Sequence, residues 1–313
     1  MCGQMRILVT GASGFAGALI VPRLIAEGHR VRALARNTDA LSGPAEAVGG
    51  DALTGSGLER AFDGVEVAYY LIHSMERAPP KQRFDERERV AAENFAAAAS
   101  RAGVARIVYL GGMLPANGSA WAQPALSRHL ASRAQVERIL LAAVPDSVAL
   151  RASIVIGARS RSFRLLVHLV ERLPVLPLPA WRRFRTQPID ARDIAEMLIA
   201  AACAPLGGRS LDAPGPDVLS YGEIVQRIAE LMLVGRPALG LGLSATPIAG
   251  RVAAAVAGED PALVIGLMES LQMDLVADSH AAADLLGVAL HSFDAAVEHA
   301  LGEWEQAEPL AAR

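Results

Sequence analysis

The chain has 313 residues, a length that suits two folding units or one enlarged α/β domain. Hydrophobic residues make up 52% of the chain and charged residues 20%, which excludes wholesale disorder. The formal net charge is -3 and the sequence contains no basic block, so a nucleic-acid partner is not expected. Two cysteines are too few for a Cys-rich metal site, and the histidines lack metal-ligand spacing, so no metal is expected.

The amino-terminal residues predict no targeting segment. Residues 1–6 run directly into an apolar strand pattern, without the separate hydrophobic region and small-residue cleavage site of a signal peptide, so we expect a cytoplasmic protein. The longest apolar tract, Leu231–Ala257, is interrupted by charged residues and prolines before it reaches the roughly 20 residues that span a bilayer. We therefore expect no integral membrane segment there, and a buried or lid-like helical region is favoured over a helix on a membrane surface.

The first 160 residues alternate short apolar runs with longer alanine-rich stretches. The expected strands are Arg6–Thr10, Arg30–Ala35, Val48–Gly50, Val67–Leu71, Arg106–Leu110 and Val148–Ile156. The expected helices are Gly14–Glu27, Gly57–Phe62, Phe84–Ala102 and Ser127–Ala143. Nearly continuous apolar strands are typical of a parallel sheet buried on both faces, and the alternation predicts the doubly wound α/β fold of Rossmann type.

The pattern changes after Gly157. Leu173–Trp181 is rich in proline and is expected to be a loop, whereas Asp193–Ala204, Ser220–Leu233 and Ala281–Trp304 are expected to be helical. Ser220 followed three residues later by Glu223 is the pattern of a capping box. We expect a dinucleotide-binding core in residues 1–160 and a smaller, mixed, substrate-binding portion in residues 161–313, with segments around 186–213 returning to the core.

Three glycines follow the first expected strand at the spacing of a phosphate-binding loop. Gly11 is suited to the tight turn, Gly14 lets backbone N–H groups approach a diphosphate, and Gly17 lets the helix pack closely on the strand. The helix N-terminus adds positive partial charge beneath the phosphates. Because strand, loop, helix and second strand are all present at the right spacing, the sequence predicts a bound dinucleotide rather than an ordinary glycine turn.

The end of the second expected strand indicates which dinucleotide is bound. Ala35 stands where an acidic residue would hold the ribose 2′-hydroxyl of NAD(H), and Arg36 can pair with a 2′-phosphate. NADP(H) is therefore expected to bind in preference to NAD(H), although Arg36 could also be an ordinary surface charge. Asp51 is placed to accept a hydrogen bond from the adenine amino group, or to act as a loop or helix cap.

Several tracts resemble the extended and atypical short-chain dehydrogenase/reductase superfamily. These tracts are Thr10–Gly17, Asp51, Asn94, Arg106–Leu110, Leu150–Gly157, Gln187–Asp193 and Leu211–Glu223, so the resemblance extends over most of the chain. Tyr70–Met75 and Leu126–Arg133 are most similar to its NAD(P)H-binding branch, which includes NmrA-like regulators and the complex I accessory subunit. The predicted cofactor contacts are Gly11, Ser13, Gly14, Phe15, Gly17, Arg36, Asp51, Ala52, Leu71, Ile72, His73, Gly111, Arg133 and Ala152.

The resemblance also implies where catalysis would occur, and here the chain departs from the superfamily. Its catalytic members use a Tyr-x-x-x-Lys pair and a serine or threonine after the fifth strand. The corresponding positions here read His129-Leu-Ala-Ser-Arg133 and Gly111-Gly-Met113. His129 is the candidate acid or base, or else a structural residue, and a cation four residues away favours its neutral form. Arg133 can hold ribose or phosphate oxygens but cannot relay a proton.

Three functions remain open from the sequence. The first is an NADP(H)-dependent oxidoreductase that transfers a hydride to or from a carbonyl, imine or activated alkene of a small apolar substrate. The second is a non-catalytic NADP(H)-binding redox sensor or assembly factor, and the third is a cofactor-retaining epimerase or dehydratase. His73 would add polarity to the crevice or be an ordinary loop histidine. The expected apolar lining, which could instead be core, is Leu114, Trp121, Phe163, Leu176, Trp181 and Phe184. By analogy with extended superfamily members, a homodimer could form through the helices Phe84–Ala102 and Ser127–Ala143.

Overall fold

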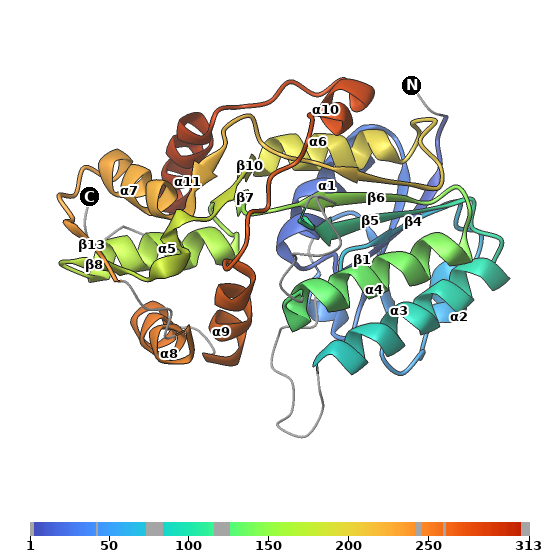
Figure 1. Cartoon of the computed structure of the whole chain (residues 1–313). Helices are drawn as coiled ribbons and strands as arrows, with labels where there is room; N and C mark the ends of the chain where they lie inside the picture. The colour runs from blue at the N-terminus through green and yellow to red at the C-terminus, as the bar shows by residue number, and fades with distance from the viewer. Residues whose placement is uncertain are drawn as a thin grey trace.

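A seven-stranded parallel sheet forms the centre of the first of the two portions of the molecule. The computed structural model describes residues 3–41, 43–72, 84–115, 126–241, 246–258 and 261–307 (Figure 1). The strands are β1 (Arg6–Thr10), β2 (Arg30–Ala35), β3 (Glu46–Gly49), β4 (Val67–Tyr70), β5 (Arg106–Gly112), β6 (Val148–Ala152) and β11 (Arg209–Asp212). Their order is β11-β6-β5-β4-β1-β2-β3, with every pair parallel. The predicted doubly wound α/β fold is confirmed.

Helices cover both faces of this sheet. On one face lie α1 (Phe15–Ala26), α6 (Ala191–Ala201) and α10 (Ala281–Leu286), and on the other α2 (Leu58–Phe62), α3 (Phe84–Arg101) and α4 (Arg128–Ala143). Successive residues of β1 serve the two faces, since Ile7 and Val9 belong to the core beneath α1 and α6, whereas Leu8 belongs to the core beneath α2, α3 and α4. The sheet is therefore buried on both sides, as its continuous apolar strands predict.

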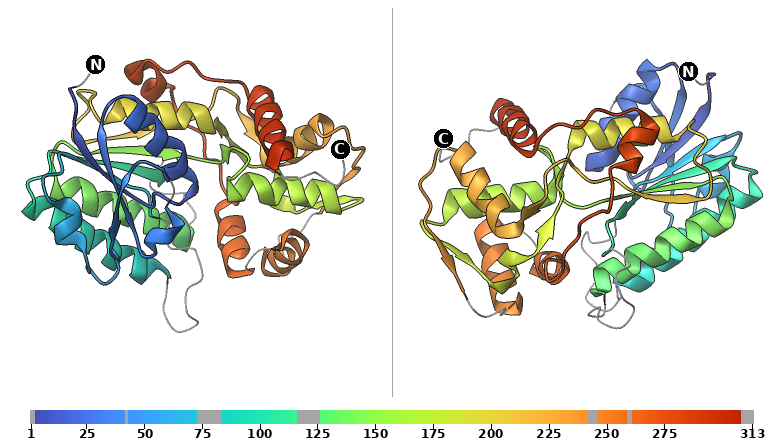
Figure 2. Two further views of the ribbon diagram at one scale, coloured as in Figure 1. Left: turned by 180° about the vertical axis from the view of Figure 1, so that it is seen from behind. Right: turned by 45° about the horizontal axis from the view of Figure 1, so that its top comes forward.

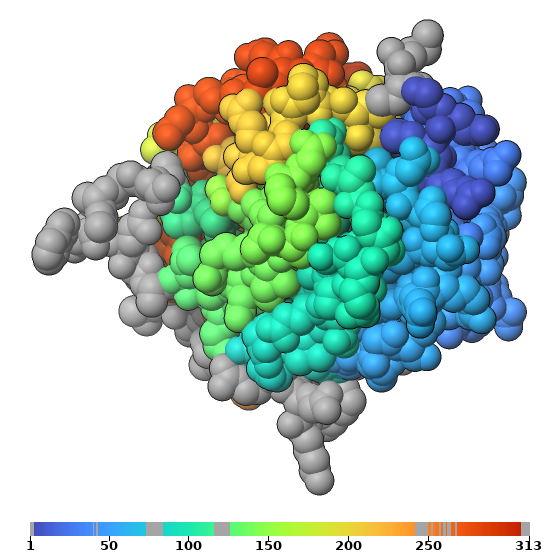
Figure 3. All heavy atoms as spheres, turned by 90° about the vertical axis from the view of Figure 1, so that its right-hand side faces the viewer, coloured from blue at the N-terminus to red at the C-terminus, as the bar shows by residue number. Residues whose placement is uncertain are grey.

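Helices α3 and α4 lie side by side on an outer face of this portion (Figure 3). Between them, the buried carboxylate of Glu88 accepts a hydrogen bond from the Ser132 hydroxyl at 2.5 Å. Nearer their amino-terminal ends, Arg128 of α4 lies 3.6 Å from Asp85 of α3. The first turns of the two helices are therefore adjacent. A homodimer through this face stays a prediction.

The second portion is a helical cluster with three short strand pairs (Figure 2). Its helices are α5 (Arg161–Arg172), α7 (Tyr221–Leu231), α8 (Thr246–Ala257), α9 (Pro261–Ser270) and α11 (Phe293–Ala307). The strand pairs are β7 (Val155–Ile156) with β10 (Ile189–Asp190), β8 (Leu176–Leu178) with β13 (Ala238–Gly240), and β9 (Arg185–Thr186) with β12 (Leu219–Ser220). The second portion also contains the short 3-10 turn η2 (Ala180–Arg183), whereas the other 3-10 turn, η1 (Thr38–Ala40), follows β2 in the first portion. A separate apolar core, which includes Phe163, Ile224 and Trp304, holds these helices together.

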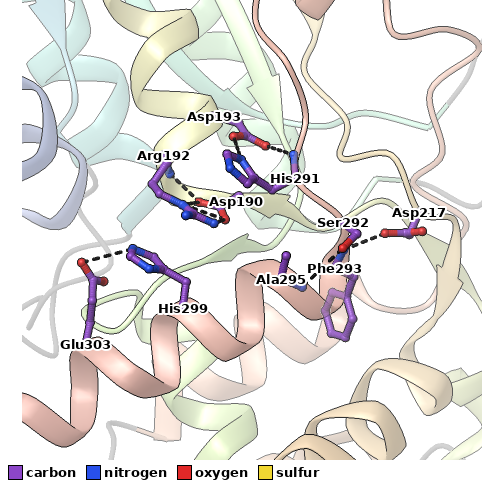
Figure 4. A network of polar contacts seen from close by, with 10 residues as sticks. All are labelled: Asp190, Arg192, Asp193, Asp217, His291, Ser292, Phe293, Ala295, His299 and Glu303. Carbon is purple, nitrogen blue, oxygen red and sulfur yellow. Dashed lines mark hydrogen bonds and ion pairs between the residues drawn. The ribbon is translucent and has the colours of Figure 1, made fainter.

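The chain passes repeatedly between the two portions, and two aspartates, of which one is buried, fix its last crossing (Figure 4). Asp193, in the first turn of α6, is fully buried; it accepts a hydrogen bond from the backbone N–H of His291 at 2.8 Å and lies 2.5 Å from the Nδ1 atom of the same residue. Asp217 accepts from the backbone N–H of Phe293 at 2.7 Å, where α11 begins. These contacts attach the segment between α10 and α11 to elements that lie far earlier in the sequence.

Three elements differ from the sequence-based expectation in their extent. The expected helix Ala281–Trp304 is two helices, because Gly287 adopts a left-handed φ of 67° that ends α10. The expected strand Val148–Ile156 is divided into β6 and β7, which pair with different partners. The expected loop Leu173–Trp181 contains the short strand β8 and the first residues of η2.

Helix α5 is absent from the sequence-based prediction, although Arg161–Arg172 has a clear helical pattern. Phe163, Val167 and Val170 lie at helical spacing, and all three are buried in the second core. The tract expected to form a buried or lid-like helical region does contain helix α8. Among the described residues, no helix combines the length and the apolar character needed to cross a bilayer.

Candidate cofactor and substrate site

A single cavity of about 930 Å³ begins along the carboxyl ends of the parallel strands and continues between the two portions. At one end it is lined by the glycine loop, the end of β2 and residues 50–53. In the middle it is lined by the residues that end β4, β5 and β6, and by α3 and α4. At the other end it is lined by α5, α7 and α9. The carboxyl edge is where open α/β sheets bind ligands, and the volume is in the range of ligand pockets.

The glycine loop has the geometry that a phosphate-binding turn requires. Gly11 adopts a left-handed φ of 68°, and a Cβ atom there would lie 2.7 Å from the carbonyl oxygen of Leu71. A Cβ atom on Gly17 would overlap the carbonyl oxygen of Gly11, so this glycine permits the close approach of α1 to the turn. Gly14 is the N-cap of α1 and supplies no side-chain cap, so the first N–H groups of the helix are available to an anion.

The adenosine end of the cavity is formed by β2 and the loop that follows β3. Arg36 and Asn37 line it, and the Arg36 side chain is exposed. The Oδ1 atom of Asp51 accepts a hydrogen bond from the backbone N–H of Leu53 at 2.9 Å, so Asp51 caps its own loop while it also lines the cavity. Asn94 of α3 donates to the carbonyl oxygens of Ala52 and Leu53, both at 2.9 Å, and fixes this loop.

His129 and Arg133 lie on the cavity-lining side of α4, and only 9% and 6% of their surfaces are exposed. Arg133 donates from Nη2 to the carbonyl oxygen of Leu110 at 2.5 Å and from Nη1 to that of Ile72 at 3.4 Å. Its Nη1 atom lies 3.7 Å from Glu88, and its guanidinium carbon lies 5.0 Å from the centre of the Tyr109 ring. The side chain therefore ties α4 to the ends of β4 and β5.

The titratable groups around Arg133 form a buried cluster. Burial raises the pKa values of Tyr70 and Tyr109 above their ordinary value, and the nearby Glu88 carboxylate raises them further, so both phenols are neutral at pH 7. Burial alone would lower the pKa of Arg133, but Tyr109 and Glu88 raise it, and the guanidinium stays charged. The cation of this cluster is therefore Arg133, whose charge Glu88 offsets. Neither of the two phenols titrates near neutral pH.

The structure corrects most of the expected apolar lining. Trp181 lines the cavity, but Phe163 and Leu176 are buried in the second core, and Phe184 packs against that core. Leu114 packs on a small cluster around Met113, and Trp121 is outside the described residues. The apolar residues that line the far end are Leu165, Leu166, Ile224, Val225, Met268, Leu271 and Leu275. Leu165 belongs to the second core and Leu166 packs against it, and both also line the cavity.

Most of the predicted cofactor residues share this cavity. Those that line it are Gly11, Ser13, Gly14, Phe15, Arg36, Asp51, Ala52, Leu71, Ile72, Gly111, Arg133 and Ala152. Gly17 is buried beneath the loop and does not line the cavity, and His73 is outside the described residues. Sequence reasoning missed Arg87 of α3 and Tyr221 of α7, which also line the cavity. In the described ranges, His, Cys, Asp and Glu side chains do not gather in any group of three or more that could hold a metal ion.

The comparison with protein families decides how the chain is classified. Residues 3–230 match the model of the NmrA-like family, which is well over half of the chain. The chain belongs to the NmrA-like family. A curated relative of this NmrA-like protein, named ceramide reductase, comes from Caulobacter vibrioides (strain NA1000 / CB15N). It is 29% identical over 231 residues, which are 72% of this chain and 70% of the relative.

Solved structures share the fold of this NmrA-like protein at low sequence identity. The crystal structure of gox2253 superposes with a TM-score of 0.76 at 19% identity, covering 98% of this chain and 100% of the other. The Bordetella bronchiseptica enzyme WbmH, solved in complex with NAD+, superposes with a TM-score of 0.72 at 16% identity, again covering 98% and 100%. Identities this low show the fold alone.

Proposed function

We propose that the protein binds NADP(H) and is an oxidoreductase that transfers a hydride to or from a small apolar carbonyl, imine or alkene substrate. The observation that carries the proposal is the single cavity that runs from the glycine loop, past His129, to an apolar chamber formed by α5, α7 and α9. The name of the Caulobacter relative and the NAD+ in the Bordetella enzyme support a reductase and a dinucleotide respectively.

The arrangement assigns distinct tasks to the chain's own residues. The bound dinucleotide would supply the hydride, and the protein must orient it and exclude water. The N–H groups at the start of α1 would hold the diphosphate, and Asp51 would accept a hydrogen bond from the adenine. The apolar side chains of α5, α7 and α9 would place the substrate in a chamber that contains little water.

His129 is the proposed source of the proton that the reduced carbonyl oxygen needs. The resemblance to the superfamily assigns it the position of the tyrosine, and it lines the same cavity as the glycine loop and the apolar chamber. The carboxylate of Glu88, 3.7 Å from Arg133, offsets the charge of the guanidinium one helical turn away.

The preference for NADP(H) is part of the proposal. Ala35 and Arg36 line the cavity at its adenosine end, so the 2′ position would face a guanidinium and no acidic residue of β2. A guanidinium can form a bidentate contact with a phosphate.

A non-catalytic NADP(H) sensor is the second candidate, and the contacts of Arg133 favour it. Two backbone carbonyl groups and Glu88 already engage the guanidinium that replaces the superfamily's lysine. Gly111 and Gly112, at the end of β5, supply no hydroxyl group. These features are compatible with cofactor binding without turnover.

Turnover separates the two candidates. NADPH consumption would be followed spectroscopically against a panel of apolar ketones, aldehydes, imines and activated alkenes. For the enzyme, we expect consumption with at least one class, and His129→Ala should lower kcat by about 10²- to 10⁴-fold, the usual contribution of a general acid. The dissociation constant of NADPH should change little in this variant. Tight NADPH binding without consumption of any compound would instead support the sensor.

A further inference from the structure

Helix α3 presents to the cavity an arginine that the proposed function leaves without a task. The Nε and Nη1 atoms of Arg87 are buried, and neither has a hydrogen-bond partner in the described part of the chain. The same side chain lines the cavity. The Arg87 side chain is partly buried, and because a guanidinium has only donor groups, its two buried N–H groups are unfavourable without an acceptor. The cavity therefore contains a cationic donor oriented for a ligand.

The position of Arg87 along α3 indicates which part of a ligand it would meet. Arg87, Ala91 and Asn94 share one side of the helix; Ala91 also lines the cavity, and Asn94 holds the loop at the adenosine end. On the neighbouring side, Glu88 contacts Ser132 and Arg133 of α4. Along the direction of the two helices, Arg87 therefore lies beside the segment of α4 that contains His129 and Arg133. Across the cavity, it lies between this segment and the adenosine end.

The other arginines that line the cavity do not duplicate this group. Arg133 is ion-paired with Glu88 and bonded to two carbonyl oxygens. Arg36 and Arg161 are exposed, at the adenosine end and at the start of α5 respectively. Among the described arginines of the cavity, Arg87 is distinguished by buried nitrogens that lack acceptors.

We propose that Arg87 binds the diphosphate bridge of the dinucleotide from the side of the cavity opposite α1. This inference rests on the proposed function, because it names a residue for the same cofactor. The diphosphate carries two negative charges, whereas the N-terminus of α1 offers about half an elementary positive charge. A guanidinium supplies the missing charge and can form two parallel hydrogen bonds with phosphate oxygens.

The test compares Arg87→Met with a matched control, Arg89→Met. Arg89 lies on the same helix, but it is paired with Glu86 and Glu93 on the solvent side. Calorimetry would measure the dissociation constants of NADPH, NADH and adenosine 2′-monophosphate, which lacks the diphosphate bridge. In Arg87→Met we expect the constants for NADPH and NADH to rise by the same factor, about 10- to 100-fold for a charged hydrogen bond. The constant for adenosine 2′-monophosphate should not change, and Arg87→Lys should retain part of the affinity.

A stability measurement accompanies the binding data. The melting temperature of the protein without ligand should change little in Arg87→Met, because the Nε and Nη1 atoms of Arg87 form no hydrogen bond with the described residues that the variant would break. A large fall would show that Arg87 stabilises the fold and would overturn the assignment.

Failure of the inference is distinguishable from failure of the proposed function. If the unmodified protein binds NADPH and Arg87→Met binds it equally well, only the assignment of Arg87 is wrong. A loss of affinity for NADPH alone would indicate that Arg87 contacts the 2′-phosphate, and it would also overturn the assignment. A change in the KM of the carbonyl substrate alone would overturn it as well. If the unmodified protein binds neither nucleotide at millimolar concentration, both the inference and the proposed function are wrong.

Discussion

Position 133 shows that arginine does not simply replace lysine in this fold. The planar guanidinium reaches Leu110, Ile72 and Glu88 at the same time, which a single ammonium group at the end of a flexible chain could not do with the same geometry. Its main observed role is to join α4 to the ends of two strands. The cationic contact with the cofactor is therefore better assigned to Arg87, one helix away, than to Arg133 alone.

The proposed preference for NADP(H) depends mainly on one residue, Arg36. We expect Arg36→Glu to raise the dissociation constant of NADPH by about 10- to 100-fold, because a charged hydrogen bond is lost and a like charge faces the 2′-phosphate. NADH lacks that phosphate, so its affinity should change far less. Titration calorimetry with both nucleotides measures the difference.

The matched control is Arg30→Glu, at the start of the same strand. Arg30 is exposed and belongs to the opposite end of β2, away from the cavity. Arg30→Glu should leave the affinities for NADPH and NADH unchanged. Equal losses of NADPH and NADH in Arg36→Glu would contradict the preference for NADP(H).

Helix α7 begins at a capping box that the sequence predicts. The Ser220 hydroxyl accepts from the backbone N–H of Glu223 at 3.2 Å, and the Glu223 carboxylate accepts from the backbone N–H of Ser220 at 2.7 Å. We expect Ser220→Ala to lower the free energy of unfolding by about 1 kcal/mol, the usual contribution of an N-cap. Urea denaturation followed by circular dichroism measures this change, and no change would show that the box is unimportant for stability.

The same box predicts a pH dependence. The hydrogen bond from the Ser220 backbone lowers the pKa of Glu223 below its ordinary value, and the Ser220 side chain lowers it further. A carboxyl group with a depressed pKa in the folded state stabilises the protein above its unfolded pKa of about 4.3, and this contribution is lost as the pH falls through the folded value. As the pH falls through this range, the free energy of unfolding should therefore decrease less in Glu223→Gln than in the unmodified protein.

The predictability of the elements follows from how local their signals are. The strand Arg6–Thr10 and the helix that follows it are predictable because an apolar run, three glycines and an alanine-rich segment are contiguous. Helix α5 carries its apolar residues between arginines, and its role depends on packing against distant segments. The break at Gly287 is set by one residue's φ, which a general helical pattern hides.

The same contrast holds for the site as a whole. The residues of the glycine loop, Arg36 and Asp51 lie within one short stretch, and the structure places them along the same cavity. The apolar chamber is assembled from residues as distant in sequence as Leu165 and Leu275, so no spacing identifies it. The significance of Arg87 depends on two buried N–H groups that find no acceptor among the described residues, which the sequence does not display.

The path of the chain predicts that the first portion is not independent. A fragment of residues 1–160 would lack β11, which pairs with β6, and the helices α6 and α10, which cover one face of the sheet. Apolar side chains such as Ile7, Val9 and Val67 would lose part of their cover. We expect this fragment to be insoluble or aggregated on gel filtration, with the full chain as the control. A monodisperse, nucleotide-binding fragment would contradict this expectation.

The attachment of His291 and Phe293 to aspartates from the middle of the sequence also constrains how proteins of this design can diversify. The segments of the second portion alternate along the chain with segments of the first. Recombination therefore cannot exchange the second portion as one continuous stretch without also replacing parts of the first. Under the proposed function, new substrate preferences would instead arise by single amino-acid replacements in the walls of the chamber, above all on α5 and α7.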